Sequence, residues 1–115
     1  MNRDKEFEEF ALKYERKKSD HERYVGFEHE LRYLLCELKD KTDRKDDFLL
    51  DYIKQAVIVY VMKDKFEETN EIFLSNIKDD FYNAIQELEE KHTDIQARTW
   101  VIKLFMEDFY FGKRS

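Results

Sequence analysis

The chain has 115 residues and a formal net charge of −6, with 27 acidic and 21 basic side chains interspersed along it. This balance argues against a surface that follows a nucleic-acid backbone, which needs a basic stripe. Two glycines and no proline argue against the tight turns of an all-β domain, and ten Phe with seven Tyr argue against disorder.

The first helix is expected over about residues 4–18. Phe7, Phe10 and Tyr14 stand at i, i+3 and i+7 and form one apolar stripe. Acidic residues crowd the start of this segment and basic residues close it, which complements the helix dipole at both ends.

A second helix should begin after Ser19, which forms an S-x-x-E capping box with Glu22, and should run to about Lys39. Gly26 inside it is expected to permit a close approach of another helix, and Cys36 is expected to be packed as a small hydrophobe. The apolar seam has heptad spacing, with two residues widening it: Tyr24, Phe27, Leu31, Leu34 and Leu38, then Val25 and Leu35.

Residues 39–47 form the longest polar interruption and the best loop, and Thr42 or Asp46 could cap a third helix. Residues 56–62, AVIVYVM, are apolar all round, which is also typical of a buried strand. No second strand is available to pair with them, so a central helix is favoured. Its apolar positions are Leu49, Ile53, Ala56 and Tyr60.

A weak break near Thr69 or Asn70 separates the third helix from a fourth. Thr93, in a second capping box with Gln96, should open the last helix, and Gly112 should end it in a left-handed conformation. The stripe of the fourth helix consists of Phe73, Ile77, Phe81, Ile85 and Leu88.

These elements predict an all-α fold, a small single-domain bundle of about five helices that occupies residues 1–115. No stretch approaches the ~20 apolar residues of a membrane span, so we expect no membrane partner. One cysteine and no apolar signal region at the N-terminus favour a reducing, cytoplasmic location.

Two pairs, Arg16 with His21 and Arg23 with His29, have the spacing Arg-x(4–6)-His. In this they resemble the HEPN superfamily of small helical domains, whose ribonuclease members carry this spacing on helices. The resemblance implies an arginine that stabilises the scissile phosphate and a histidine that transfers a proton. A metal-independent ribonuclease is therefore the alternative function. The capping box of Ser19 and Glu22 explains the sequence around Arg16 and His21 without catalysis, and it is the favoured interpretation.

Carboxylates three residues apart occur at Glu6 and Glu9 and at Glu37 and Asp40. Such pairs share a helix face and resemble the Mg²⁺ ligands of helical nucleotide pyrophosphohydrolases of the MazG type. Because 27 acidic residues generate these pairs freely, solvated faces are the favoured interpretation. The three histidines match no zinc or di-iron spacing, and we expect no metal and no cofactor.

Apolar residues exceed what a small bundle can cover in two places, residues 56–62 and residues 100–111. A well-buried core is one interpretation of this apolar excess. The other, which we adopt, is that part of the last helix forms a protein interface, because aromatic side chains supply the anchors of such interfaces. The predicted interface residues are Trp100, Leu104, Phe105, Phe109, Tyr110 and Phe111.

The predicted function is a small acidic, non-enzymatic protein-binding module: a regulator, inhibitor, antitoxin or immunity protein, or assembly adaptor. Its partner would be another protein or a second copy of itself, and a homo-oligomer is the first hypothesis. The abundance of Lys, Asp, Glu, Ile, Phe and Tyr is typical of AT-rich bacterial, plasmid or phage genomes.

Overall fold

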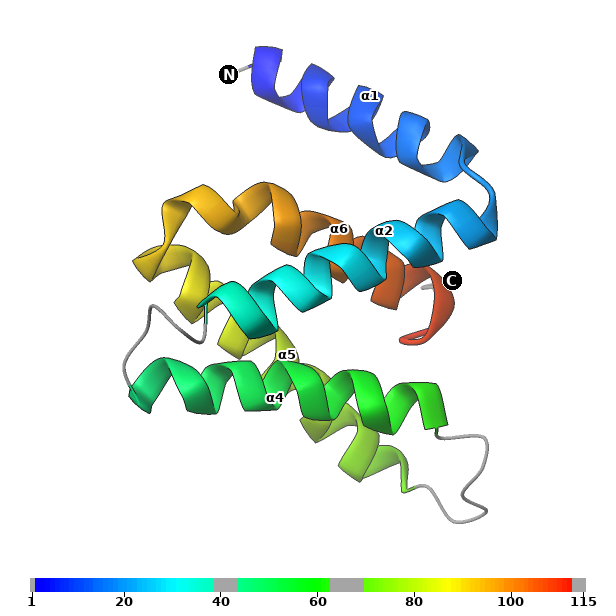
Figure 1. The fold of residues 1–115 in the computed structure, drawn as a ribbon. Coiled ribbons are helices and arrows are strands. Elements are labelled where there is room, and N and C mark those ends of the chain that lie inside the picture. Colours follow the sequence, from blue (N-terminus) through cyan, green and yellow to red (C-terminus); the bar gives the residue numbers. More distant parts are fainter. Residues whose placement is uncertain (1, 39–43, 63–69, 113–115) are drawn as a thin grey trace.

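The computed structural model describes residues 2–38, 44–62 and 70–112, and these residues form an all-α bundle of five helices (Figure 1). A π-helix, η1 (Tyr33–Leu38), continues the second helix, and a short 3₁₀ turn, η3 (Thr93–Ile95), precedes the last one. No strand occurs in these ranges, which confirms that residues 56–62 are helical. The α-helices are α1 (Asn2–Lys17), α2 (Asp20–Arg32), α4 (Arg44–Met62), α5 (Glu71–Lys91) and α6 (Gln96–Phe109).

The core lies where α4 packs against α5 and α2 packs against α6. Its residues come from the apolar faces that the helical periodicity predicts, so each of these four helices buries one side. The largest fully buried side chains are Phe81, Leu34, Ile53, Ile85, Leu88, Ile102 and Met106.

Side chains cap the starts of α2 and α5; the sequence predicts the cap at Ser19, and for α5 it predicts only a break near Thr69 or Asn70. The hydroxyl of Ser19 accepts a hydrogen bond from the backbone N–H of Glu22 at 3.2 Å. The side-chain oxygen of Asn70 accepts one from the backbone N–H of Ile72 at 2.7 Å. Each bond satisfies a donor that the first turn of a helix leaves without a partner, so both boundaries are set by local chemistry.

The predicted capping box at Thr93 is wrong. Thr93 belongs to the 3₁₀ turn, and α6 begins only at Gln96 without a side-chain cap. The backbone N–H of Ile95 bonds to the carbonyl of His92 at 3.2 Å, and the Ile95 side chain is buried. Burial of this isoleucine in the core therefore outweighs the local capping preference.

The second predicted helix is not a regular α-helix over its whole length, because the π-helix η1 takes the place of its last turns. Leu34 and Leu38 both remain in the core, whereas Cys36, two residues from each, lies on the opposite side and is exposed. The expectation of a packed cysteine is thus wrong. Gly26 permits no close helix approach either, since a Cβ atom there would meet nothing within 4 Å, and its neighbour Val25 is exposed.

Helix α4 begins at Arg44, inside the predicted loop, so Asp46 is not its cap; Thr42 lies outside the described residues. It is also not a central helix, because it lies at one edge of the bundle (Figure 1). Ile53, Ala56 and Tyr60 are buried, but the side that carries three other apolar residues is exposed: Ile58, Val61 and Met62.

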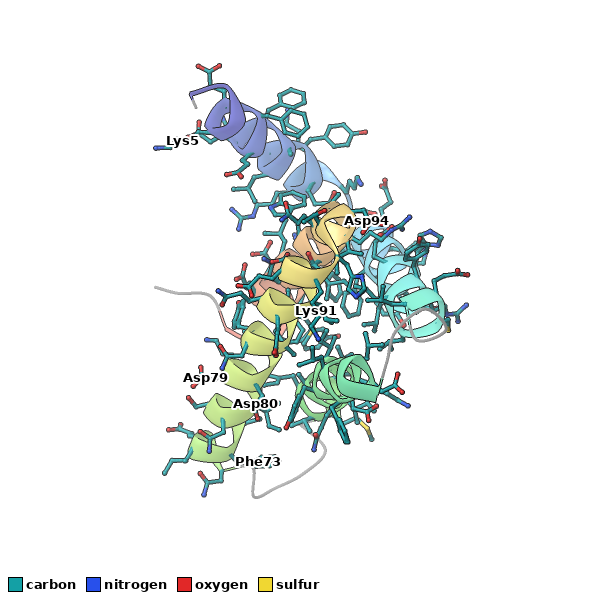
Figure 2. All side chains as sticks on the ribbon, turned by 90° about the vertical axis from the view of Figure 1, so that its left-hand side faces the viewer. Lys5, Phe73, Asp79, Asp80, Lys91 and Asp94 are labelled. Carbon is teal, nitrogen blue, oxygen red and sulfur yellow. The ribbon has the colours of Figure 1, made fainter. Side chains whose placement is uncertain are left out.

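The first turn of α5 extends past the other helices. Figure 2 shows Phe73 at the far end of this helix, and its ring is exposed although the rest of the predicted stripe is buried. Within the described ranges, no helix combines the length and the apolar character that crossing a bilayer requires.

Candidate protein-binding surface

Helix α1 presents its aromatic residues to solvent. Phe7, Phe10 and Tyr14 are 71%, 67% and 62% exposed, and we call these three residues the aromatic stripe. Figure 2 shows ring-bearing side chains of α1 pointing away from the other helices into open space. Large aromatic side chains are the residues that gain most from burial, so a full row of them in water is a candidate contact surface.

The opposite side of α1 holds this helix against the bundle. Leu12, about 140° around the helix from Phe7, is half-buried, and Glu15 is buried. One helical turn after Leu12, the guanidinium of Arg16 donates hydrogen bonds to both carboxylate oxygens of Asp108 on α6, at 3.2 and 3.1 Å. These contacts attach the C-terminal half of α1 to the bundle, whereas residues 5–10 are exposed on every side and the aromatic stripe is in solvent.

A second apolar surface lies between α2 and α4. It is a groove of about 440 Å³, which we call the α2–α4 groove. Phe27 is the buried part of its lining, and Ile58, Val61 and Met62 are exposed at its α4 side. The lining residues are Tyr24, Phe27, Glu28, Leu31, Arg32, Leu35, Val57, Ile58, Val61, Met62 and Tyr110.

The polar rim of the α2–α4 groove is built on α2. Glu28 pairs with Arg32 one turn later, with an N–O distance of 3.0 Å. A hydrogen bond to Glu28 and the negative charge of that carboxylate raise the pKa of Tyr24 above its ordinary value. The Tyr24 hydroxyl therefore stays protonated over the physiological range, and the groove keeps two charges only at its edge.

The six predicted interface residues of the last helix are divided between the core and the surface. Leu104 and Phe105 are buried, and the Phe105 ring stacks on Phe27 with centroids 4.3 Å apart. Phe111 is half-buried, with edge-on contacts to Tyr60 and Phe81 at 4.8 and 5.1 Å. These three side chains therefore bind the helices of the bundle to one another.

The other three predicted interface residues keep accessible surface. Phe109 is 38% exposed, and Tyr110 lines the α2–α4 groove. Trp100 lines a separate hollow of about 240 Å³ together with Tyr82 and Lys103. Phe109 and Tyr110 both pack against the Phe105 ring, whereas Trp100 lies apart from them beside its own hollow, so the six predicted residues do not form one continuous patch.

The arginines of the two Arg–His pairs converge on one carboxylate. Besides Arg16, Arg23 of α2 donates to Asp108 with an N–O distance of 2.7 Å, and its guanidinium stacks over Phe109, 5.0 Å from the ring centroid. Burial raises the pKa of Asp108, but hydrogen bonds from the two arginines outweigh it and leave that pKa below its ordinary value. His21 and His29 are both exposed. The arginines therefore connect α1, α2 and α6 through Asp108.

The carboxylate pairs do not gather into a site. Glu6 and Glu9 are exposed on α1, Glu37 is exposed on η1, and Asp40 lies outside the described residues. Among residues 2–38, 44–62 and 70–112, no group of three or more His, Cys, Asp or Glu side chains could hold a metal ion.

The sequence predicts excess apolar area at residues 56–62 as well as on the last helix, but the predicted interface includes only the last helix, so the aromatic stripe and the exposed side of α4 were missed as contact surfaces. One signal was present. The aromatic row of α1 is narrow, with charged residues at most other positions of the helix. A helix with so little apolar surface beside its aromatic row depends on an outside partner to bury that row.

Comparisons with protein-family models, with curated proteins and with solved structures found no match to this chain.

Proposed function

We propose that the chain is a non-enzymatic protein-binding module of the cytoplasm that docks apolar, aromatic helix surfaces onto another protein or onto a second copy. A regulator, an inhibitor, an antitoxin or immunity protein and an assembly adaptor all work in this way. The observation that supports the proposal most directly is the aromatic stripe, with Phe7, Phe10 and Tyr14 exposed in one row.

The energetic argument follows from the area involved. An aromatic side chain buries roughly 150–250 Å² in a well-packed contact. At about 25 cal/mol per Å², each ring that moves from water into an interface contributes several kcal/mol at most, before the costs of association. A row of such rings on one helix is therefore sufficient to anchor a specific contact, as in the recognition of amphipathic helices by grooves.

Residues of the last helix add to this surface in the proposal. Phe109 and Tyr110 keep exposed area, and Tyr110 lines the α2–α4 groove. Trp100 lies apart from them, beside the smaller hollow. We therefore expect Phe109 and Tyr110 to contribute to docking more than Trp100.

The test is a quantitative capture experiment in the native host. The tagged full-length chain is compared with a variant that carries Phe7→Ser, Phe10→Ser and Tyr14→Ser, and with the control Ile72→Ser. Ile72 is equally exposed but lies on the first turn of α5. We expect the control to capture a protein that the stripe variant fails to capture. That protein is either a different protein of the host or an untagged copy of the chain itself.

Equal recovery of every captured protein by the stripe variant and the wild type would overturn the proposal. Circular dichroism of all three proteins is the necessary companion measurement. Because the substituted side chains are exposed, their helical content should agree.

A further inference from the structure

We infer that the aromatic stripe of one chain docks into the α2–α4 groove of a second copy, so that two chains form a closed, symmetric dimer. This inference rests on the proposed function and names its partner. It concerns two surfaces of one molecule that are complementary in kind, because one is an amphipathic helix and the other an apolar groove between helices.

The dimensions of the two surfaces agree. The stripe runs from Phe7 to Tyr14, about 10 Å along the helix at 1.5 Å per residue. On α2 the groove runs from Tyr24 to Leu35, about 16 Å by the same measure. Anchors at i, i+3 and i+7 are the spacing with which helices fill such grooves.

The stripe does not reach the groove of its own chain. Helices α1 and α4 lie on opposite sides of the layer formed by α2 and α6 in both views (Figures 1 and 2). Only Lys18 and Ser19 separate α1 from α2, and the Ser19 cap restricts the path between them. The ion pair between Arg16 and Asp108 attaches the C-terminal end of α1 to α6.

The exposed area supports a second copy as the occupant. The three stripe residues are 62–71% exposed, and an aromatic side chain buries roughly 150–250 Å² in a well-packed contact, so the stripe offers about 300–500 Å². In a symmetric dimer each chain buries one stripe and a similar area of groove, about 600–1,000 Å² in total, which is comparable with the ~800 Å² that each partner contributes to a standard stable interface. A partner that covered only the stripe or only the groove would leave the other surface in water, whereas a second copy covers both.

Symmetry closes the assembly. When each chain supplies one stripe and one groove, two equal contacts related by a two-fold axis satisfy all four surfaces. The result is a dimer that does not grow into a filament.

The experiment is sedimentation velocity of the full-length chain from low to high micromolar concentration, with three single variants. Phe10→Asp places a charge in the stripe, Ile58→Asp places one in the groove, and Phe73→Asp is the control on α5. All three side chains are exposed, so each variant should retain the fold, and circular dichroism checks this.

We expect the wild type and Phe73→Asp to be dimers, and Phe10→Asp and Ile58→Asp each to weaken the dimer by about thirtyfold or more, as a hot-spot residue does. An equimolar mixture of these two weakened variants provides the decisive measurement. Phe10→Asp retains an intact groove and Ile58→Asp retains an intact stripe, so the mixture should form a heterodimer through one intact contact.

A wild type that stays monomeric, a dimer that withstands either charged substitution, or a mixture that forms no heterodimer would each overturn the inference. A monomeric wild type whose stripe still captures another protein would leave the proposed function standing. The two failures are therefore distinguishable.

Discussion

Asp108 of α6 connects three helices through its carboxylate. Its carboxylate accepts hydrogen bonds from Arg16 of α1 and Arg23 of α2, and the Arg23 side chain is only 8% exposed. Within the part of the chain that the structure describes, the Nε–H of Arg23 has no hydrogen-bond partner, so Asp108 is the acceptor that compensates for burying this guanidinium. A buried charge that loses its partner is strongly destabilising.

Asp108→Ala is therefore expected to lower the free energy of unfolding by about 3 kcal/mol, because it leaves the Arg23 charge buried and unpaired. Urea denaturation followed by circular dichroism measures this. Asp80→Ala, at an exposed carboxylate of α5, is the matched control and should change stability by less than about 0.5 kcal/mol. A loss below about 1 kcal/mol for Asp108→Ala would contradict the compensating role.

The same carboxylate should make stability depend on acid pH. The pKa of Asp108 is lower in the folded chain than in the unfolded chain, where it is about 3.9. Its contribution is therefore complete above the unfolded pKa and disappears as pH falls through the folded pKa. We expect the stability difference between wild type and Asp108→Ala to shrink below about pH 4. Urea titrations at a series of pH values measure it, and a constant difference would refute the expectation.

The two glycines should respond to alanine with opposite signs. Gly26 lies inside α2 with open space around it, so Gly26→Ala should raise stability by about 1 kcal/mol through helix propensity. Gly112 has a φ of +81°, a left-handed conformation that a Cβ atom disfavours, so Gly112→Ala should lower stability by about 1 kcal/mol. Thermal and urea unfolding of both variants test these two expectations. A loss of stability in Gly26→Ala would show that the added methyl group meets neighbouring atoms and would contradict the first.

At the scale of elements, α1 and α6 are both rich in aromatic residues but differ in what surrounds them. Helix α6 lies against α2 and α5, so its aromatic side chains are divided between core and surface. Helix α1 contacts the bundle near its C-terminal end, where Glu15 is buried and Arg16 pairs with Asp108, and its residues 5–10 are exposed. Aromatic content therefore does not determine burial; the number of packed neighbours does.

Two phenylalanines one turn apart on α6 allow a direct test of this difference. Phe105→Ala should lower the free energy of unfolding by about 3–5 kcal/mol, because it removes the stacking on Phe27 and leaves a cavity. Phe109→Ala should cost less, about 1–2 kcal/mol, since its ring is partly exposed and packs only at the surface, between Phe105 and the Arg23 guanidinium. Urea denaturation of both variants gives the comparison, and equal losses would contradict it.

For the whole molecule, exposed apolar area is the dominant property. The radius of gyration is 14.7 Å, somewhat above the ~13.4 Å typical of a compact domain of this length. The aromatic stripe and the α2–α4 groove lie on separate sides of this extended molecule. A dimer that buries them would make stability depend on protein concentration.

Thermal unfolding should therefore shift with concentration. We expect the Tm of the wild type to rise by several degrees over an approximately hundredfold increase in concentration, because dimerisation stabilises the folded state by mass action. The Tm of Phe10→Asp should stay constant over the same range. Differential scanning calorimetry measures both, and a concentration-independent wild-type Tm would count against the dimer.

Local chemistry accounts for what could be predicted of the fold. The capping residues Ser19 and Asn70, and the i, i+4 spacing of Ile77, Phe81 and Ile85, act within a few residues of the chain. Such signals can be recognised in the sequence without knowledge of contacts between distant residues. The start of α6 was predicted wrongly because a long-range effect, the burial of Ile95, overrides the cap.

The candidate surface was harder to predict, because a sequence identifies an apolar face but not what covers it. The apolar run of α4 resembled a central helix, yet Ile58, Val61 and Met62 are exposed because α4 lies at an edge. The aromatic stripe of α1 resembled an ordinary inner face for the same reason.

By itself, the sequence determined that the chain is helical, where α2 and α5 begin, and which side of each helix is apolar, because these properties follow from side-chain periodicity and capping. Only the tertiary structure decided that the aromatic stripe of α1 stays in solvent and that α4 lies at an edge. These outcomes depend on long-range contacts such as that between Arg16 and Asp108. Burial is a property of the assembled helices, since an apolar face is covered only when another element has room to pack against it.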